Sequence, residues 1–190
     1  YYSVDKDIDS VTKNYSRFVF VRAGRKENAF IPQEREDGKV TLICSPEEEE
    51  RLKPFVDKNR DLLVIKSIPF YDDSSRIPNY QSLPTARMLA ALAFAWNFDI
   101  DNIMILDDNI KGFYAKDELL QKDCFWKDIY GMYQSSAAEG GLACLSIQTH
   151  KPTDKNQLTS EIVIREGACG YKSFFIDIKS IKSIAKDPIC

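Results

Sequence analysis

The stretch Ile103-Met104-Ile105-Leu106-Asp107-Asp108-Asn109 brings four apolar residues directly up to two carboxylates and an amide. A short run without polar residues is typical of a central parallel strand, because both faces of such a strand are buried. Ligands of open α/β sheets bind just beyond the carboxyl ends of these strands. Two acids there are costly to desolvate unless something pairs with them, and a divalent cation is a usual partner of oxygen ligands. We therefore expect Asp107, Asp108 and Asn109 in a ligand site; the alternative is an ordinary turn, which Asp and Asn also favour.

The segments before this stretch predict strand–helix–strand units. Ser45-Pro46-Glu47-Glu48 is a helix start with Ser45 as the N-cap, and this helix is expected to end near residue 59. A helix expected over 84–97 is apolar nearly all round, as buried helices are. Strands are expected over 17–21, 40–44, 62–68 and 103–107. The fold class is therefore α/β, a Rossmann-like, mostly parallel twisted sheet with flanking helices.

The sequence patterns that predict helices and strands are weaker at the two ends of the chain and in one long loop. Residues 1–16 are polar and are expected to be a lead-in, whereas the loop over 69–84 has a length that often serves function. Beyond residue 110 we expect a helix at 117–132, strands at 142–148, 161–165 and 171–178, and a basic helical segment at 179–186.

Composition narrows the class of protein. The 190 residues are 44% hydrophobic, which suits one globular domain, and the net charge of −3 argues against nucleic-acid binding driven by bulk charge. The five cysteines form no Cys-x-x-Cys pair and there is one histidine, so a zinc site is not expected. Buried thiols in the cytoplasm or another reducing compartment are expected instead. No run of 18 apolar residues predicts a membrane span, and the start at Tyr1 without Met suggests an excised or processed piece.

Three further positions are candidates for anion or metal binding. Arg87 is the one charged residue between Pro84 and Phe98, near a helix start where the macrodipole disfavours a cation unless an anion binds there. The alternatives for Arg87 are a salt bridge to a nearby carboxylate or an extension of the side chain to solvent. Arg22 and Gly24 follow the first strand and are expected at the same sheet edge as Asp107, where Arg22 would grip a phosphate or be an exposed loop arginine.

Together these segments resemble GT-A type nucleotide-sugar glycosyltransferases over about residues 17–112. The matching segments are Phe18-Val19-Phe20-Val21-Arg22, Thr85-Ala86-Arg87-Met88-Leu89-Ala90 and Ile105-Leu106-Asp107-Asp108-Asn109. The Asp-Asp-Asn version is similar to that of the glycosyltransferases associated with modified-base synthesis in DNA. The family motif is Asp-x-Asp, and the Asn at position 109 leaves Asp107 and Asp108 as the metal-binding carboxylates.

The resemblance implies a function and a division of the chain. It implies Mn²⁺ or Mg²⁺ at Asp107 and Asp108, with His150 as a further ligand, although His150 also suits a surface loop. It implies a nucleotide-sugar donor bound by Arg22, Gly24, Arg87 and the residues 107–109, and an acceptor hydroxyl on a protein, glycan or nucleic acid. One domain over 1–190 would hold a nucleotide-binding half at 17–112 and an acceptor half at 113–190. Carboxylates available in that second half are Glu139, Glu161 and Asp177.

Two other classes remain as alternatives. One is a non-catalytic module of the same fold that binds a nucleotide or a protein. The other is a phosphatase of the HAD-like type, which also places an acid after an apolar strand but uses Asp-x-Asp, a pattern that residues 107–109 do not supply. A dinucleotide enzyme is disfavoured because no Gly-x-Gly follows the first strand.

Overall fold

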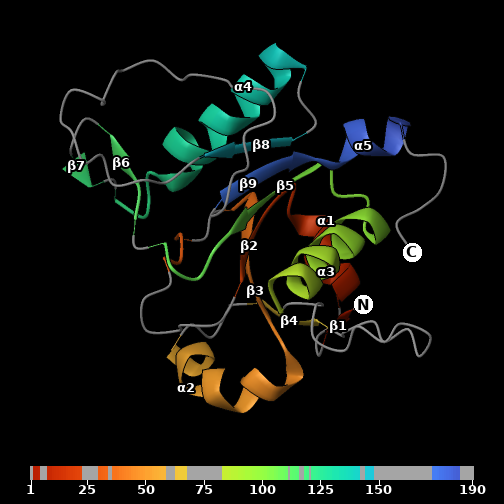
Figure 1. Cartoon of the computed structure of the whole chain (residues 1–190), viewed down its shortest axis with the longest axis vertical. Coiled ribbons are helices and arrows are strands. Elements are labelled where there is room, and N and C mark those ends of the chain that lie inside the picture. The colour runs from red at the N-terminus through yellow and green to blue at the C-terminus, as the bar shows by residue number, and fades with distance from the viewer. Residues whose placement is uncertain are drawn as a thin grey trace.

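The computed structural model describes residues 2–4, 8–22, 30–33, 36–58, 63–67, 83–110, 112–115, 118–119, 121–141, 144–147 and 173–184. Within these residues, seven strands form one mixed sheet in the order β1-β4-β3-β2-β5-β9-β8 (Figure 1). The strands are β1 (Tyr2–Val4), β2 (Arg17–Arg22), β3 (Gly38–Cys44), β4 (Leu63–Ser67), β5 (Asn102–Leu106), β8 (Cys144–Ile147) and β9 (Ser173–Asp177). Two short strands, β6 (Tyr114–Ala115) and β7 (Glu118–Leu119), pair separately.

The four central strands are parallel, as the sequence predicts. β2 pairs with β3 on one side and β5 on the other, and β4 lies beyond β3. Residues 18–21 and 103–106 are fully buried, which explains their uninterrupted apolar character. β3 and β4 are added on one side of β2, and β5 on the other. A crevice between neighbouring strand ends is expected where the order reverses in this way, at the carboxyl ends of β2 and β5.

The strands outside this centre run antiparallel to their neighbours, which the sequence did not predict. β1 is antiparallel to β4, and β9 is antiparallel to β5. β8 is antiparallel to β9 and therefore runs in the same direction as β5. An apolar run shows that a strand is buried, but it does not show in which direction its neighbour runs.

Helices cover both faces of the sheet. They are α1 (Ile8–Asn14), α2 (Glu49–Lys58), α3 (Leu83–Asn97), α4 (Gly131–Gly140) and α5 (Ile178–Ile184), with a 3₁₀ turn η1 (Pro46–Glu48) before α2 and a π-helical segment η2 (Phe125–Tyr130) before α4. Phe18 and Phe20 of β2 point toward α3, whereas Val19 and Val21 face the helix formed by η2 and α4. Figure 1 shows α3 and α4 on opposite sides of the sheet.

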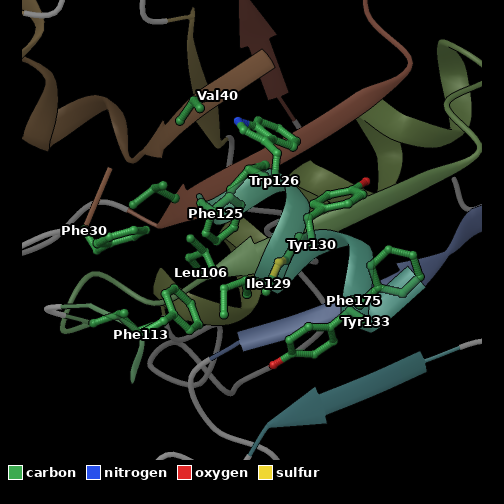
Figure 2. Close-up of a cluster of buried hydrophobic side chains, with 14 of the residues drawn as sticks. Phe30, Val40, Leu106, Phe113, Phe125, Trp126, Ile129, Tyr130, Tyr133 and Phe175 are labelled. Atoms are coloured by element: carbon green, nitrogen blue, oxygen red, sulfur yellow. The ribbon is translucent and has the colours of Figure 1, made fainter. Parts of the chain in front are cut away.

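An aromatic cluster fills the η2 and α4 face (Figure 2). Its members are Phe30, Phe113, Phe125, Trp126, Tyr130, Tyr133 and Phe175. Trp126 donates its indole N–H to the carbonyl of Gln33 at 2.7 Å, and the hydroxyl of Tyr130 donates to the Asn102 side chain at 2.6 Å. These polar ends have partners, so the rings can be buried without unmet donors.

Three expectations about elements were wrong. Residues 1–16 are not merely a lead-in, because they form β1 and α1, and Tyr2, Val4 and Ile8 pack against the α3 face. The helix expected at 117–132 begins at Phe125 and ends at Gly140, because its buried residues recur at helical spacing only from Phe125 onward. The α3 helix is not buried all round, since Leu89 is exposed.

Other expectations agree with the structure or cannot be compared with it. The remaining strands and helices of the described chain lie within a few residues of their expected bounds. The strand expected at 161–165 and most of the loop at 69–84 lie outside the described residues. Cys44 is buried as expected, but Cys124 is half-buried and Cys144 is exposed. In the part of the chain that is described, no helix is both long enough and apolar enough to cross a membrane.

Candidate ligand site at the carboxyl ends of the parallel strands

Arg22 and Asp107 meet at the carboxyl ends of β2 and β5. Arg22 is the last residue of β2, and Asp107 directly follows β5. The Arg22 Nη2 and Asp107 Oδ1 atoms are 3.2 Å apart, and the two side chains are 8% and 23% exposed. The structure therefore brings together two residues that the sequence placed at one edge of the sheet. Arg22 is buried, and the alternative of an exposed loop arginine is wrong.

The Asp-Asp-Asn segment forms a tight turn at this point. The N–H of Ile110 donates to the carbonyl of Asp107 at 3.3 Å, and the N–H of Asp108 donates to Asp107 Oδ1 at 3.1 Å. The carbonyl of Ile110 accepts the N–H of Phe30 at 2.8 Å, which ties the turn to a distant segment. The turn alternative and the ligand alternative are thus compatible, because the turn holds the side chains at the strand end.

Asn109 has an unmet acceptor in this turn. Its Oδ1 atom is buried and has no hydrogen-bond partner among the described residues. A buried amide oxygen without a partner is costly, and about 1–3 kcal/mol is typical for such a group. A bound cation or an N–H donor of a ligand would remove that cost.

Arg87 makes an ion pair with Glu48, which follows β3. The Nη2 atom of Arg87 donates to Glu48 Oε2, and Arg87 is 5% exposed. The salt bridge that the sequence offered as the alternative for Arg87 is therefore present. Its Nε atom is buried and finds no hydrogen-bond partner within the described part of the chain.

Glu48 is the residue of this edge that the sequence reasoning missed. Its Oε2 accepts the N–H of Ser45 at 3.0 Å, while its own N–H donates to the Ser45 carbonyl at 3.0 Å. The signal was present, because Ser followed three residues later by Glu is the pattern of a capping box. Its Arg87 partner, 39 residues further on, could not be found from spacing.

The charges around Glu48 shift two pKa values. Burial disfavours the charged form of Glu48, but the hydrogen bond from the Ser45 backbone and the charge of Arg87 outweigh it, and the Glu48 pKa is lowered. Cys44 lies beside them at the end of β3. Burial, followed by the charges of Glu48 and Glu49, raises the pKa of the Cys44 thiol to about 11. Cys44 is therefore a neutral, unreactive thiol near neutral pH.

Ion pairs continue along the edge to the end of β4. Lys66 Nζ lies 3.0 Å from Glu49 Oε1. The carboxyl ends of β5, β2, β3 and β4 therefore carry three cation–carboxylate pairs in a row. An edge of this kind is polar and locally neutral, so it can admit a ligand carrying both an anionic group and a cation.

The side chains at this edge provide some, but not all, of the ligands that a divalent cation such as Mg²⁺ or Mn²⁺ needs. Asp107, Asp108 and Asn109 offer oxygen atoms, which Mg²⁺ and Mn²⁺ prefer. No group of three or more His, Cys, Asp or Glu side chains that could hold a metal is found among the described residues. His150 and Gly24 lie outside those residues. The strand before His150, β8, ends at Ile147, which pairs with Ser173, and Ser173 pairs with Leu106 at the same edge.

Of the three carboxylates expected in the acceptor half, the structure places Asp177 away from this edge. Asp177 lies at the other end of the sheet, where it pairs with Asn102 and caps α5 through the N–H and hydroxyl of Ser180. Glu139 is exposed on α4, and Glu161 lies outside the described residues. Asp177 is therefore excluded as a base at the carboxyl edge.

Comparisons of this chain with models of protein families, with curated proteins and with solved structures find no match.

Proposed function

We propose that the chain is a glycosyltransferase that binds the diphosphate of a nucleotide sugar at the carboxyl ends of β2 and β5. The observation that carries the proposal is the meeting of Arg22 with the Asp107-Asp108-Asn109 turn at the point where the strand order reverses. Numbered along the chain, the parallel strands β2, β3, β4 and β5 lie in the order third, second, first, fourth, which is the order of the first four strands of doubly wound nucleotide-binding folds. This strand order also supports the proposal that the glycosyltransferase is of the GT-A type.

Each residue of the edge has a role in this proposal. Asp107 and Asp108, with His150 from the segment after β8, would hold Mn²⁺ or Mg²⁺, which supplies positive charge to the leaving diphosphate when bound. Arg22 and Arg87 add charge from side chains that are already fixed by carboxylates. Asn109 accepts a hydrogen bond from the donor or contributes an oxygen to the cation, and Gly24 belongs to the loop that contacts the nucleotide.

The chemistry requires stabilisation of the leaving group most of all. An acceptor hydroxyl attacks the anomeric carbon and releases its proton to water or to the departing diphosphate, while the bond from that carbon to the phosphate oxygen breaks. The electron pair moves to the diphosphate, so fixed cations beside its oxygens lower the barrier. Arginine side chains that are already buried and held in position by carboxylates are suited to this task, because they need to move little during the reaction.

The first experiment is a thermal-shift panel with UDP-, GDP-, CMP- and ADP-sugars, each with and without Mn²⁺. A ligand that binds only the native state raises the melting temperature, and the rise grows with the ratio of its concentration to its Kd. We expect one nucleotide to stabilise the chain in a Mn²⁺-dependent manner. No shift with any donor would contradict the proposal.

Asp108→Ala tests the metal within this site. We expect the variant to lose Mn²⁺-dependent nucleotide binding and to keep its fold, because Asp108 lies in the turn beyond the packed strand. Asp101→Ala is the matched control, since Asp101 is an exposed carboxylate before the opposite end of β5. Calorimetric titration of both variants measures the effect, and unchanged affinity in Asp108→Ala would refute the metal assignment.

A non-catalytic nucleotide-binding module is the second candidate. The observation that favours it is the pairing of Arg22 and Arg87 with carboxylates, together with the position of Asp177 away from the edge. Slow hydrolysis of the bound donor in the absence of an acceptor separates the two functions. A glycosyltransferase releases free sugar under these conditions, whereas a binding module releases none.

A further inference from the structure

Arg87 is an arginine in an unusual position. It lies near the amino-terminal end of α3, where the helix dipole disfavours a cation, and it is nevertheless 5% exposed. An arginine is kept buried in such a place only if its charge and its donors find partners. The described contacts supply one such partner, Glu48.

Glu48 is itself held by the backbone of its own turn, and its carboxylate contacts two arginines. Its Oε2 atom accepts the N–H of Ser45 at 3.0 Å as well as Nη2 of Arg87, and its Oε1 atom accepts Nη2 of Arg51 at 3.1 Å. The backbone bond to Ser45 fixes the carboxylate relative to the end of β3. The carboxylate therefore fixes the plane of the Arg87 guanidinium relative to the sheet edge.

The guanidinium is planar, so holding one nitrogen also restricts the directions of the other donors. The Nε atom of Arg87 is buried and has no hydrogen-bond partner among the residues that the structure describes. Arginine can hold a carboxylate with one nitrogen and a phosphate oxygen with another, because its fork has five donors. The unmet Nε–H is thus a donor that a ligand can satisfy.

We propose that Glu48 is a positioning residue of the donor site, which holds Arg87 by Nη2 so that its Nε–H donates to a phosphate oxygen. This inference rests on the proposed function and assigns to that site a residue outside the Asp-Asp-Asn turn. Glu48 touches no substrate in this assignment and acts only through Arg87.

The test uses inorganic pyrophosphate with Mg²⁺ as the probe and calorimetric titration as the measurement. We expect Glu48→Ala to weaken pyrophosphate binding by about tenfold, the scale of one charge-assisted hydrogen bond. Glu48→Gln keeps an oxygen that can accept from Ser45 and Arg87, and its affinity is expected to stay within about threefold of the wild type because neutral acceptors are weaker but still bind. If Glu48→Gln restores the pyrophosphate affinity that Glu48→Ala loses, residue 48 acts by positioning Arg87 and not by its negative charge alone.

Two matched controls isolate the Arg87 contact. Glu49→Ala removes the neighbouring carboxylate, which pairs with Lys66 and not with Arg87. Arg51→Gln removes the other arginine that Glu48 binds, from a side chain that is 54% exposed. Both are expected to bind pyrophosphate as the wild type does, and the circular dichroism of every variant is compared to confirm that it folds.

A spectroscopic readout follows the Arg87 Nε–H itself. Its ¹⁵N–¹H signal, assigned by its loss in Arg87→Lys, is expected to shift when pyrophosphate saturates the wild type. Wild-type affinity in Glu48→Ala, or an unmoved Arg87 signal in a saturated wild type, would overturn the inference and leave the proposed function standing. A wild type that binds neither pyrophosphate nor any sugar nucleotide would remove the proposed function, and this inference with it.

Discussion

Position 38 requires glycine, because the ring of Trp126 packs directly against its backbone. A Cβ atom at this position would lie 2.8 Å from Cζ2 of Trp126, whose ring is fully buried and whose indole N–H is bonded to Gln33. A contact this short forces the ring or the first residue of β3 to move. The requirement is invisible in the sequence, because 88 residues separate the two positions, 126 minus 38.

Gly38→Ala is expected to destabilise the protein by about 1–3 kcal/mol, the usual cost of overpacking a rigid core. Urea denaturation followed by tryptophan fluorescence measures this change in the free energy of unfolding. Gly131→Ala is the control, since its Cβ would meet its nearest atom at an ordinary 3.5 Å and it lies in α4. A stability loss in Gly131→Ala as large as that in Gly38→Ala would contradict the argument.

Because of Cys44, the free energy of unfolding is expected to decrease as the pH rises into the alkaline range. The pKa of its thiol is raised from 9.0 to about 11, first by burial and then by the charges of Glu48 and Glu49. Well below pH 9 the thiol is neutral in the folded and unfolded states. Between pH 9 and 11 only the unfolded chain releases the proton, so the free energy of unfolding falls as pH rises through this window.

Cys44→Ala is expected to remove that part of the pH dependence. The difference in unfolding free energy between wild type and variant should therefore shrink from pH 8 to pH 11, by about 1.4 kcal/mol for each unit of pKa difference at most. Burial also raises the pKa of Tyr130, but Tyr130 is present in both proteins and cancels in the difference. A constant difference across the range would show that Cys44 does not titrate as argued.

At the scale of elements, α3 is the helix that fixes the sheet. Phe94, in the last turn of α3, is fully buried. Its ring contacts the rings of Tyr2, Phe18, Phe20 and Phe98. The helix therefore joins β1 to β2, which the sequence could not show because residues 1–16 carry too few apolar positions to indicate a strand.

Phe94→Ala is expected to cost about 3–5 kcal/mol, as truncation of a buried aromatic ring usually does. Leu89→Ala on the same helix is the matched control, because Leu89 is 39% exposed and surface changes are typically within about 0.5 kcal/mol. Thermal unfolding of both variants provides the comparison. Similar losses in the two variants would mean that α3 does not bury one face against the sheet.

The sequence predicted elements best where one local pattern determined them. Residues 103–106 and 18–21 form short apolar runs, as strands buried on both faces do. Ser45 precedes the 3₁₀ turn η1, and its N–H donates to Glu48 within that same turn. η2 was misplaced because its buried aromatic residues pack against β3 and β9, which lie far away in the chain. Local patterns contain no information about such partners.

At the scale of the whole molecule, the direction of the parallel strands brings the two halves of the candidate site together. Arg22 and Asp107 are 85 residues apart in the chain, 107 minus 22, and their side chains nevertheless form an ion pair. Their meeting at one edge is predictable from the sequence, because ligands and polar side chains gather where parallel strands end. The same rule cannot find Glu48, because its value to the site depends on a side-chain contact with Arg87.

The sheet order also determines which backbone amides open first. β2, β3 and β5 each have a strand on both sides and lie between two helical layers, whereas β1 and β8 are the end strands of the described sheet. Amides in the centre should exchange with solvent only through global unfolding, and those of the end strands through local opening at lower free energy. We expect hydrogen–deuterium exchange to be slowest in β2 and β5 and measurably faster in β8, where Cys144 is exposed. Equal protection of the backbone amides of β8 and β2 would mean that another part of the chain or a partner covers β8. The same measurement therefore also tests whether β8 is an edge strand.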